Sequence, residues 1–221
     1  MPHLLHIDSS SLAEGSVSRD VAASFRAVWQ EAEPNGRVTY RDLAAHPLPH
    51  IDHAGVTART TPRELHTPRQ REAMELQDLL IGELEAADAY LFSVPMYNWS
   101  VPSAFKAWVD QVLVAGRTAS LTGDPLEGPL SGRPAIVIAP RGGSYAPGTP
   151  QYRNDFVVPF LEKLFAQTIG LDLRIITPEL TLAAVNPAMH HLREPAETSL
   201  AHAHAAAEEH ALSLAERLRG P

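Results

Sequence analysis

The sequence of 221 residues contains no cysteine. This absence excludes disulfide bonds, thiolate metal ligands, thiol nucleophiles and dithiol redox chemistry. A chain of this length buries most of the surface that its unfolded form exposes, so it needs no disulfide or metal ion to stabilise a core. Any redox chemistry must therefore be carried by a bound cofactor.

Basic residues are also in deficit, since 18 Lys and Arg stand against 26 Asp and Glu and the net charge is -8. An acidic protein repels nucleic acid, so any phosphate should be bound locally by backbone amides and hydroxyls. No apolar run approaches the roughly 18 residues that cross a bilayer. Residues 1–8 lack the basic region and apolar core of a signal peptide. We expect a soluble, cytoplasmic protein with neither nucleic acid nor membrane as a partner.

Short apolar runs alternate with longer segments of helical periodicity. The runs predict strands at residues 3–7, 37–43, 89–95, 135–139 and 171–177. Helices are predicted around Val21 to Trp29, Ala73 to Leu84 and Phe105 to Val112 (with Pro102 in the first turn), over residues 156–169, and in a last helix ending at Gly220. The nearly continuous runs at 89–95 and 135–139 are typical of strands covered on both faces.

This alternation predicts an α/β three-layer sandwich, a five-stranded parallel sheet with helices on both faces. Five strands suit the order 2-1-3-4-5, in which ligands bind at the carboxyl ends of the strands. No repeat or boundary divides the chain, so residues 1–221 are predicted to form one domain. Residues 46–68 contain four prolines and are interpreted as a long surface loop, a feature that usually signals function or an interface.

Three loops follow predicted strands one, three and four, and the topology brings them to one edge. Residues 8–19 are rich in serine just before a helix, where free N–H groups and the helix dipole attract an anion. The alternative is a plain serine cap, which is common at helix starts. The loop is not a Walker loop, because it lacks the Gly-Lys-Ser/Thr ending.

The other two loops carry aromatic residues and glycines. Met96, Tyr97 and Trp99 could pack on a planar ring while Asn98 contacts its edge; the alternative is an aromatic turn packed on its own domain. In residues 140–148, the pair Gly142-Gly143 lets the backbone approach a ligand closely. Arg141 or the glycine amides could stabilise negative charge there, whereas glycine alone would equally suit a flexible loop.

These segments resemble the FMN-dependent NADH-azoreductases, which are related to the flavodoxin-like NAD(P)H quinone reductases. The most specific segments are Ser10 with Ser16-Val17-Ser18, the Pro-Met-Tyr-Asn-Trp stretch at 95–99, and Arg141-Gly142-Gly143. Residues 43–49, 65–70 and 106–116 also fit, and the similarity runs from the first strand to near the C-terminus. So many ordered segments are unlikely to match by chance.

The resemblance implies a flavodoxin-like fold that binds FMN. It places the FMN phosphate on the serine loop, the isoalloxazine ring along residues 96–99, and the pyrimidine end of that ring at residues 140–143. The predicted cofactor-binding residues are Ser10, Ser16, Val17, Ser18, Pro95, Met96, Tyr97, Asn98, Trp99, Pro140, Arg141, Gly142, Gly143 and Tyr145. The flavin carries the electron chemistry, so no catalytic acid or base is required.

In such enzymes NADH or NADPH reduces the flavin and leaves, and an azo compound or quinone then enters the same pocket, in a ping-pong scheme. The resemblance also implies a homodimer with active sites at the interface, to which residues 46–68 and the helix containing Trp108 would contribute. The rival hypothesis is a flavodoxin-type electron carrier or a non-catalytic flavin-binding protein. The long chain and the Tyr97–Trp99 loop favour the enzyme.

Three departures from the family pattern bear on the acceptor. Pro140 stands where serine is usual and has no N–H to offer. Residues 119–122 and 166–168 lack the aromatics that the family has there. A third hypothesis is therefore a pathway-specific reductase with a wider or more polar pocket. His202, His204 and His210 are interpreted as part of a solvated helix rather than a metal site, because zinc needs convergent ligands.

Overall fold

The computed structural model describes residues 1–220, and its centre is a parallel sheet of five strands. The strands are β1 His3–Asp8, β2 Arg37–Asp42, β3 Ala89–Ser93, β4 Pro134–Ile138 and β5 Asp172–Ile176. Their order, β2-β1-β3-β4-β5, confirms the prediction. In the register Asp8 lies opposite both Asp42 and Ser93, and Ser93 lies opposite Ile138. The strands that lead into the three loops therefore end at the same level.

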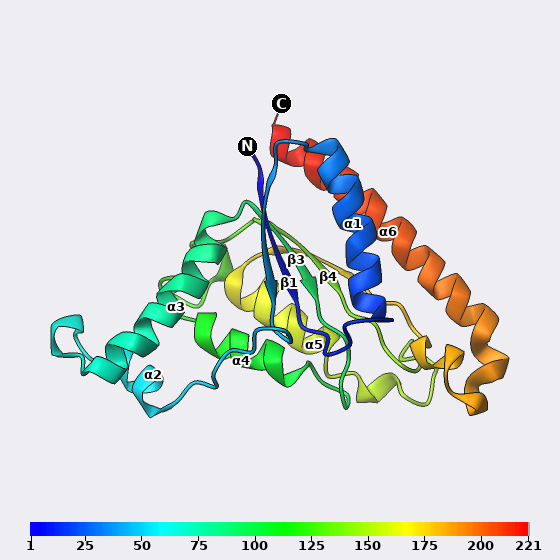
Figure 1. Ribbon diagram of the computed structural model, residues 1–221, viewed down its shortest axis with the longest axis horizontal. Helices are drawn as coiled ribbons and strands as arrows, with labels where there is room; N and C mark the ends of the chain where they lie inside the picture. The colour runs from blue at the N-terminus through cyan, green and yellow to red at the C-terminus, as the bar shows by residue number, and fades with distance from the viewer. Residues whose placement is uncertain (221) are drawn as a thin grey trace.

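Helices cover both faces of the sheet (Figure 1). On one face, α1 Val17–Ala32 packs beside α6 Arg193–Arg219. On the other face lie α3 Pro68–Ala86, α4 Ser103–Val112 and α5 Val158–Leu161. This arrangement confirms the predicted flavodoxin-like sandwich. No helix within residues 1–220 combines the length and apolar character that crossing a membrane requires.

Alternating side chains of the buried strands feed two separate cores. Leu4 and Leu91 face α1 and α6, whereas Leu5 and Phe92 face α3, α4 and α5. In the second core the Phe92 ring stacks on Phe165 at 4.4 Å between centroids, and Phe105 and Trp108 complete the aromatic cluster. Burial on both faces explains why β3 and β4 read as continuous apolar runs.

The prediction that residues 46–68 form a loop is only partly right. It contains a short helix, α2 His53–Ala58, and a 3-10 turn, η1 Arg63–Leu65. The Asp52 side chain caps α2 by accepting a hydrogen bond from the Gly55 N–H at 2.9 Å. A six-residue helix is shorter than two turns, so it leaves no hydrophobic period in the sequence.

The helix predicted at residues 156–169 is present but is not a regular α-helix. It begins at Val158, and from Glu162 to Ile169 it is wound as a π-helix, η4. Asp155 holds its start by accepting from the N–H groups of Val157 and Val158. Pro102 also differs slightly from prediction, since it occupies the N-cap of α4 and not its first turn. Short 3-10 turns occupy the remaining connections: η2 Pro125–Glu127, η3 Tyr152–Asn154, η5 Thr181–Ala184 and η6 Pro187–Leu192.

Candidate functional site

The loops after β1, β3 and β4 are joined by hydrogen bonds at the carboxyl edge of the sheet. The N–H and hydroxyl of Ser9 donate to the Ser93 carbonyl at 3.1 and 2.7 Å. The Ser11 N–H donates to the Tyr97 hydroxyl at 2.9 Å. The Met96 N–H donates to the Pro140 carbonyl at 3.0 Å. The structure thus brings together the three segments in which the sequence predicted a site.

The start of α1 carries backbone donors that nothing in the described chain satisfies. Ser16 occupies the N-cap with an extended backbone, yet its hydroxyl makes no capping bond and lies 3.2 Å from the Ser18 hydroxyl. The N–H groups of Val17, Ser18 and Arg19 have no acceptor within residues 1–220. Such free donors at the positive end of a helix dipole form a site for an anion. Ser16 thus occupies the cap position without making the side-chain hydrogen bond of an ordinary serine cap.

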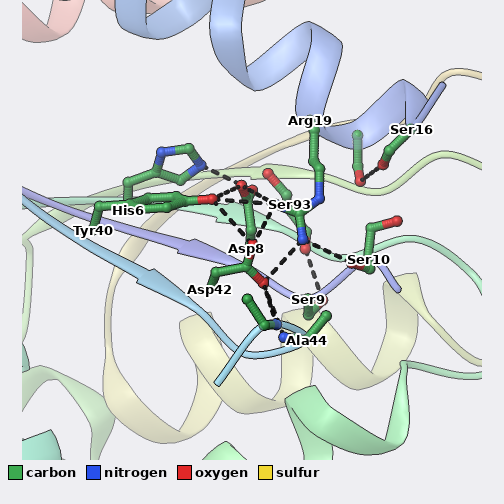
Figure 2. Close-up of polar contacts among 12 residues, drawn as sticks. His6, Asp8, Ser9, Ser10, Ser16, Arg19, Tyr40, Asp42, Ala44 and Ser93 are labelled. Atoms are coloured by element: carbon green, nitrogen blue, oxygen red, sulfur yellow. Dashed lines mark hydrogen bonds and ion pairs between the residues drawn. The ribbon is translucent and has the colours of Figure 1, made fainter. Parts of the chain in front are cut away.

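A buried network of charges lies directly beneath this loop (Figure 2). Asp8, which is 3% exposed, accepts hydrogen bonds from His6 at 3.0 Å, Tyr40 at 2.7 Å and Arg19 at 3.1 Å. Arg19 also forks onto Asp42 at 2.7 and 2.9 Å. The network therefore links β1, β2 and the first turn of α1.

The network keeps its two carboxylates and its guanidinium charged and the Tyr40 hydroxyl protonated. Burial opposes ionisation of Asp8, but the hydrogen bond and charge of His6, with the Tyr40 hydroxyl, outweigh it and lower the pKa of Asp8 to about 2. The hydrogen bond from Arg19 lowers the pKa of Asp42. Burial and the bond to Asp8 raise the pKa of Tyr40. The two carboxylates and the guanidinium thus stay ionised, and Tyr40 stays a hydrogen-bond donor, at neutral pH.

The β3–α4 loop makes a tight turn that presents two side chains to solvent. Tyr97 and Ser100 exchange backbone hydrogen bonds of 2.8 and 3.0 Å. Between them Asn98 and Trp99 have φ values of 49° and 68°, positive at both positions as in a type I′ turn. Left-handed backbone at a tryptophan is strained, and such strain gathers at functional sites. Trp99 is 55% exposed, whereas Met96 packs against the core.

In the β4–α5 loop the arginine and the glycines play different parts. Arg141 is 7% exposed and pairs with Asp155 at 2.9 Å and with Glu179 at 3.1 Å. Its guanidinium also lies 5.7 Å from the centre of the Tyr145 ring. Two carboxylates already balance its charge. The N–H groups of Gly142 and Gly143, in contrast, have no acceptor within residues 1–220. Of the two predicted anion stabilisers, the structure therefore favours the glycine amides.

A cavity of about 590 Å³ opens beside the Tyr97–Ser100 turn. Its wall comes from the β3–α4 loop, from one side of α4, from the segment before α2 and from α5. The lining residues are His50, Tyr97, Asn98, Ser100, Val101, Ser103, Lys106, Ala107, Asp110 and Phe160. His50 also lines two further hollows between the 43–52 segment, α3 and α4. Through His50, the segment at residues 46–68 thus borders this cavity.

Sequence reasoning missed the charge network, although a signal for it is present. His6 and Asp8 are two residues apart in β1, as are Tyr40 and Asp42 in β2, so each pair lies on one face. The register places His6 opposite Tyr40 and Asp8 opposite Asp42. Four polar residues at alternating positions of neighbouring strands indicate a buried polar cluster.

Comparison with known proteins places the chain among its relatives. The protein family described as having a flavodoxin-like fold matches residues 2–211. The chain belongs to this family. The FMN-dependent NADH:quinone oxidoreductase of Frankia alni is 50% identical over 201 residues, 91% of this chain and 94% of that protein. The protein of the same name from Streptomyces avermitilis is 48% identical over 98% of this chain and 99% of its own length. The family predicted from the three loops is confirmed.

Solved structures of azoreductases have the same fold. The FMN-dependent NADH-azoreductase from Bacillus anthracis str. Ames Ancestor, solved in complex with FMN, superposes with a TM-score of 0.80 at 22% identity, covering 97% of this chain and all of that one. An azoreductase from Bacillus anthracis str. Sterne also gives a TM-score of 0.80, at 20% identity and over 96% of this chain. At this identity the likeness concerns the fold alone.

The charge of Asp8 should make the stability of the protein depend on pH. The folded pKa of about 2 lies below the ordinary value of 3.8, so the contribution is complete above pH 4 and is lost as the pH falls toward 2. We expect Asp8→Asn to reduce the free energy of unfolding at pH 7 by about 2 kcal/mol. The deficit relative to wild type should shrink between pH 4 and pH 3.

Urea unfolding at several pH values measures this difference. Glu209→Gln, a change to an exposed carboxyl on α6, is the control and should leave the unfolding free energy nearly unchanged. If the Asp8→Asn deficit in unfolding free energy is the same at pH 3 as at pH 7, the stabilisation by Asp8 does not depend on its charge.

Proposed function

We propose that this protein is an FMN-dependent oxidoreductase that passes a hydride from NADH or NADPH through FMN to quinones or azo compounds. The observation that carries the proposal is the arrangement of unpartnered amides at the sheet edge. One set lies at the start of α1 and the other at Gly142 and Gly143, and the Tyr97–Ser100 turn belongs to the same joined edge. Relatives of 47–50% identity named FMN-dependent NADH:quinone oxidoreductase support it.

The described residues suit the two ends of FMN. We propose that the hydroxyls of Ser10, Ser16 and Ser18 and the amides from Val17 onward hold the phosphate, because they offer donors at a helix N-terminus. Pro95, Met96, Tyr97, Asn98 and Trp99 would lie along the isoalloxazine ring. Pro140, Arg141, Gly142, Gly143 and Tyr145 would surround its pyrimidine end. Bound FMN supplies the chemistry that accepts a hydride and passes it on.

The protein's own groups would bind FMN, orient it and shield it. Donors held in place by the loops require no rearrangement when negative charge develops nearby, which is the basis of electrostatic preorganisation. The free N–H groups of Gly142 and Gly143 fit that role toward the polar ring edge. Pro140 cannot join them, because it lacks an N–H and its carbonyl already accepts from Met96. The exposed Trp99 would cover the ring from one side.

The cavity beside the Tyr97–Ser100 turn has room for a small molecule. Its volume of about 590 Å³ lies within the range of small-molecule sites. The long chain and the Tyr97–Trp99 loop are the features that favour an enzyme over an electron carrier. Donor and acceptor would use this space in turn, as a ping-pong scheme requires. Residues 119–122 and 166–168 are not among the residues that line this cavity, so the wider or more polar pocket suggested by their lack of aromatics stays a prediction.

An anaerobic absorbance experiment tests the function. Protein reconstituted with FMN should lose its oxidised flavin spectrum when NADH is added and regain it when a quinone or azo dye follows. Protein without FMN should give neither change. Binding of FMN without bleaching by NADH or NADPH would favour the carrier hypothesis. Failure to bind FMN would overturn the proposal.

A double substitution tests the phosphate site. Ser16→Ala with Ser18→Ala should raise the Kd for FMN by at least about tenfold, because each hydrogen bond to a charged group is worth about 1.5–3 kcal/mol. Flavin fluorescence quenching gives the affinity. Ser24→Ala is the matched control, since its hydroxyl lies on the same helix but bonds His204 at 2.7 Å. Equal FMN affinity in the double variant and wild type would refute the assignment.

We also propose that the protein is a homodimer with the site near the interface. The exposed Trp99 and Phe156, linked by a hydrogen bond from the Phe156 N–H to the Trp99 carbonyl at 3.2 Å, form an apolar surface beside the cavity that a second copy would cover. Sedimentation velocity should give twice the 24.0 kDa mass of one chain. A single species of 24.0 kDa at micromolar concentration would contradict the dimer.

A further inference from the structure

Arg19 joins the two ends of the serine loop. Its Nη2 donates to the Ser10 carbonyl at 2.8 Å, at the start of the loop. Its own backbone lies in the first turn of α1, at the end of the loop. Residues 11–15 between these points are exposed. The side chain of Arg19 therefore crosses from the helix back to the strand end and closes the loop (Figure 2).

The carboxylates that hold Arg19 are themselves anchored. Asp42 accepts its two bonds from Arg19 and also accepts from the N–H groups of Ala44 and Ala45 at 2.9 and 3.0 Å. Asp8 accepts the third bond from Arg19 and is fixed in β1 directly opposite Asp42. A planar guanidinium forked onto fixed carboxylates has little freedom to move.

Arg19 has no charge or terminal nitrogen to spare for a ligand. Its single positive charge faces the two negative charges of Asp8 and Asp42. Both terminal nitrogens are engaged, Nη1 with Asp8 and Asp42 and Nη2 with Asp42 and Ser10. A phosphate at this loop would consequently be bound by amides and hydroxyls and not by the terminal nitrogens of the arginine, whose Nε is buried and has no partner among residues 1–220.

We propose that Arg19 is a positioning residue for phosphate recognition. It would set the distance between Ser10 and the free amides of Val17 to Arg19 before the ligand arrives, so that the ordering of the loop does not have to accompany binding. The inference rests on the proposed function, because the phosphate in question is that of FMN. It predicts that Arg19 matters for the phosphate and not for the ring of the flavin.

Lysine is the informative replacement. Arg19→Lys keeps the positive charge between Asp8 and Asp42, so the buried carboxylates keep a partner. Its single ammonium lacks the planar fork that reaches two carboxylates and the Ser10 carbonyl at once. The charge balance is thus preserved while the geometry of the loop is loosened.

Riboflavin is FMN without its phosphate, so comparing the two ligands separates binding of the phosphate from binding of the flavin ring. Fluorescence quenching measures the Kd of FMN and of riboflavin for wild type and for Arg19→Lys. We expect the Kd for FMN to rise about tenfold or more and the Kd for riboflavin to change less than about twofold. Titration with inorganic phosphate, followed by the amide NMR signals of residues 16–19, should show the same weakening without any flavin.

Arg41→Lys is the matched control. Arg41 is 19% exposed, against 17% for Arg19, and forks onto Glu83 with its Nε at 2.8 Å. It lies on β2 but does not touch the serine loop. The Arg41→Lys variant should bind FMN, riboflavin and phosphate like wild type.

The outcomes are distinct. Equal losses of FMN and riboflavin affinity in Arg19→Lys, or no loss of either, would overturn the positioning role and leave the proposed function standing. A wild-type protein that binds no FMN would overturn both.

If circular dichroism shows that Arg19→Lys does not fold, Asp42→Asn takes its place. An asparagine oxygen still accepts from the N–H groups of Ala44 and Ala45, but one of the two acceptors for Arg19 is gone. A phosphate-selective loss in that variant supports the role, and losses equal for FMN and riboflavin overturn it.

Discussion

The parallel register of β1, β3 and β4 is the constraint on which the site depends. It ends these strands at one level, with Asp8 opposite Ser93 and Ser93 opposite Ile138. The chain must leave each strand at the same edge, so the three loops meet there and bond to one another. Polar donors that are scattered along the sequence become one surface. A shift of one residue between strands would turn the alternating side chains to the opposite core.

Beneath that edge charged groups are buried, and hydrogen bonds from neighbouring side chains replace their contacts with water. A buried carboxylate with no partner is strongly unfavourable, whereas one with several donors is stable. Asp8 has three such donors from three different segments, β1, β2 and α1. The same bonds that stabilise the charge join the loop to the sheet. Stability and the shape of the proposed phosphate site are therefore coupled through Arg19.

The features that repeat locally could be predicted from the sequence. The five strands and the helix faces followed from apolar runs and periods, since burial on one or both faces leaves a regular trace, whereas the strand order was taken from the arrangement that five such strands usually adopt. The short helix α2 left no such trace, because six residues are too few for an apolar pattern to repeat. The π-helix η4 could not be told from an α-helix, because the apolar positions at 156–169 suit both. The candidate site residues were predicted by resemblance, and the structure brings their three loops to one edge.

The sequence alone determined the class of fold, the family and the need for a cofactor, because composition, periodicity and ordered motifs are properties of the linear chain. Tertiary structure decided which polar groups are satisfied and which are free. Arg141 looked available to a ligand until Asp155 and Glu179, 14 and 38 residues further on, were found beside it. Arg19 was predicted only as the last residue of the serine-rich segment at 8–19, and nothing in the sequence connected it with Asp42. Pairing between distant residues depends on how strands and loops meet in space, and no local pattern records it.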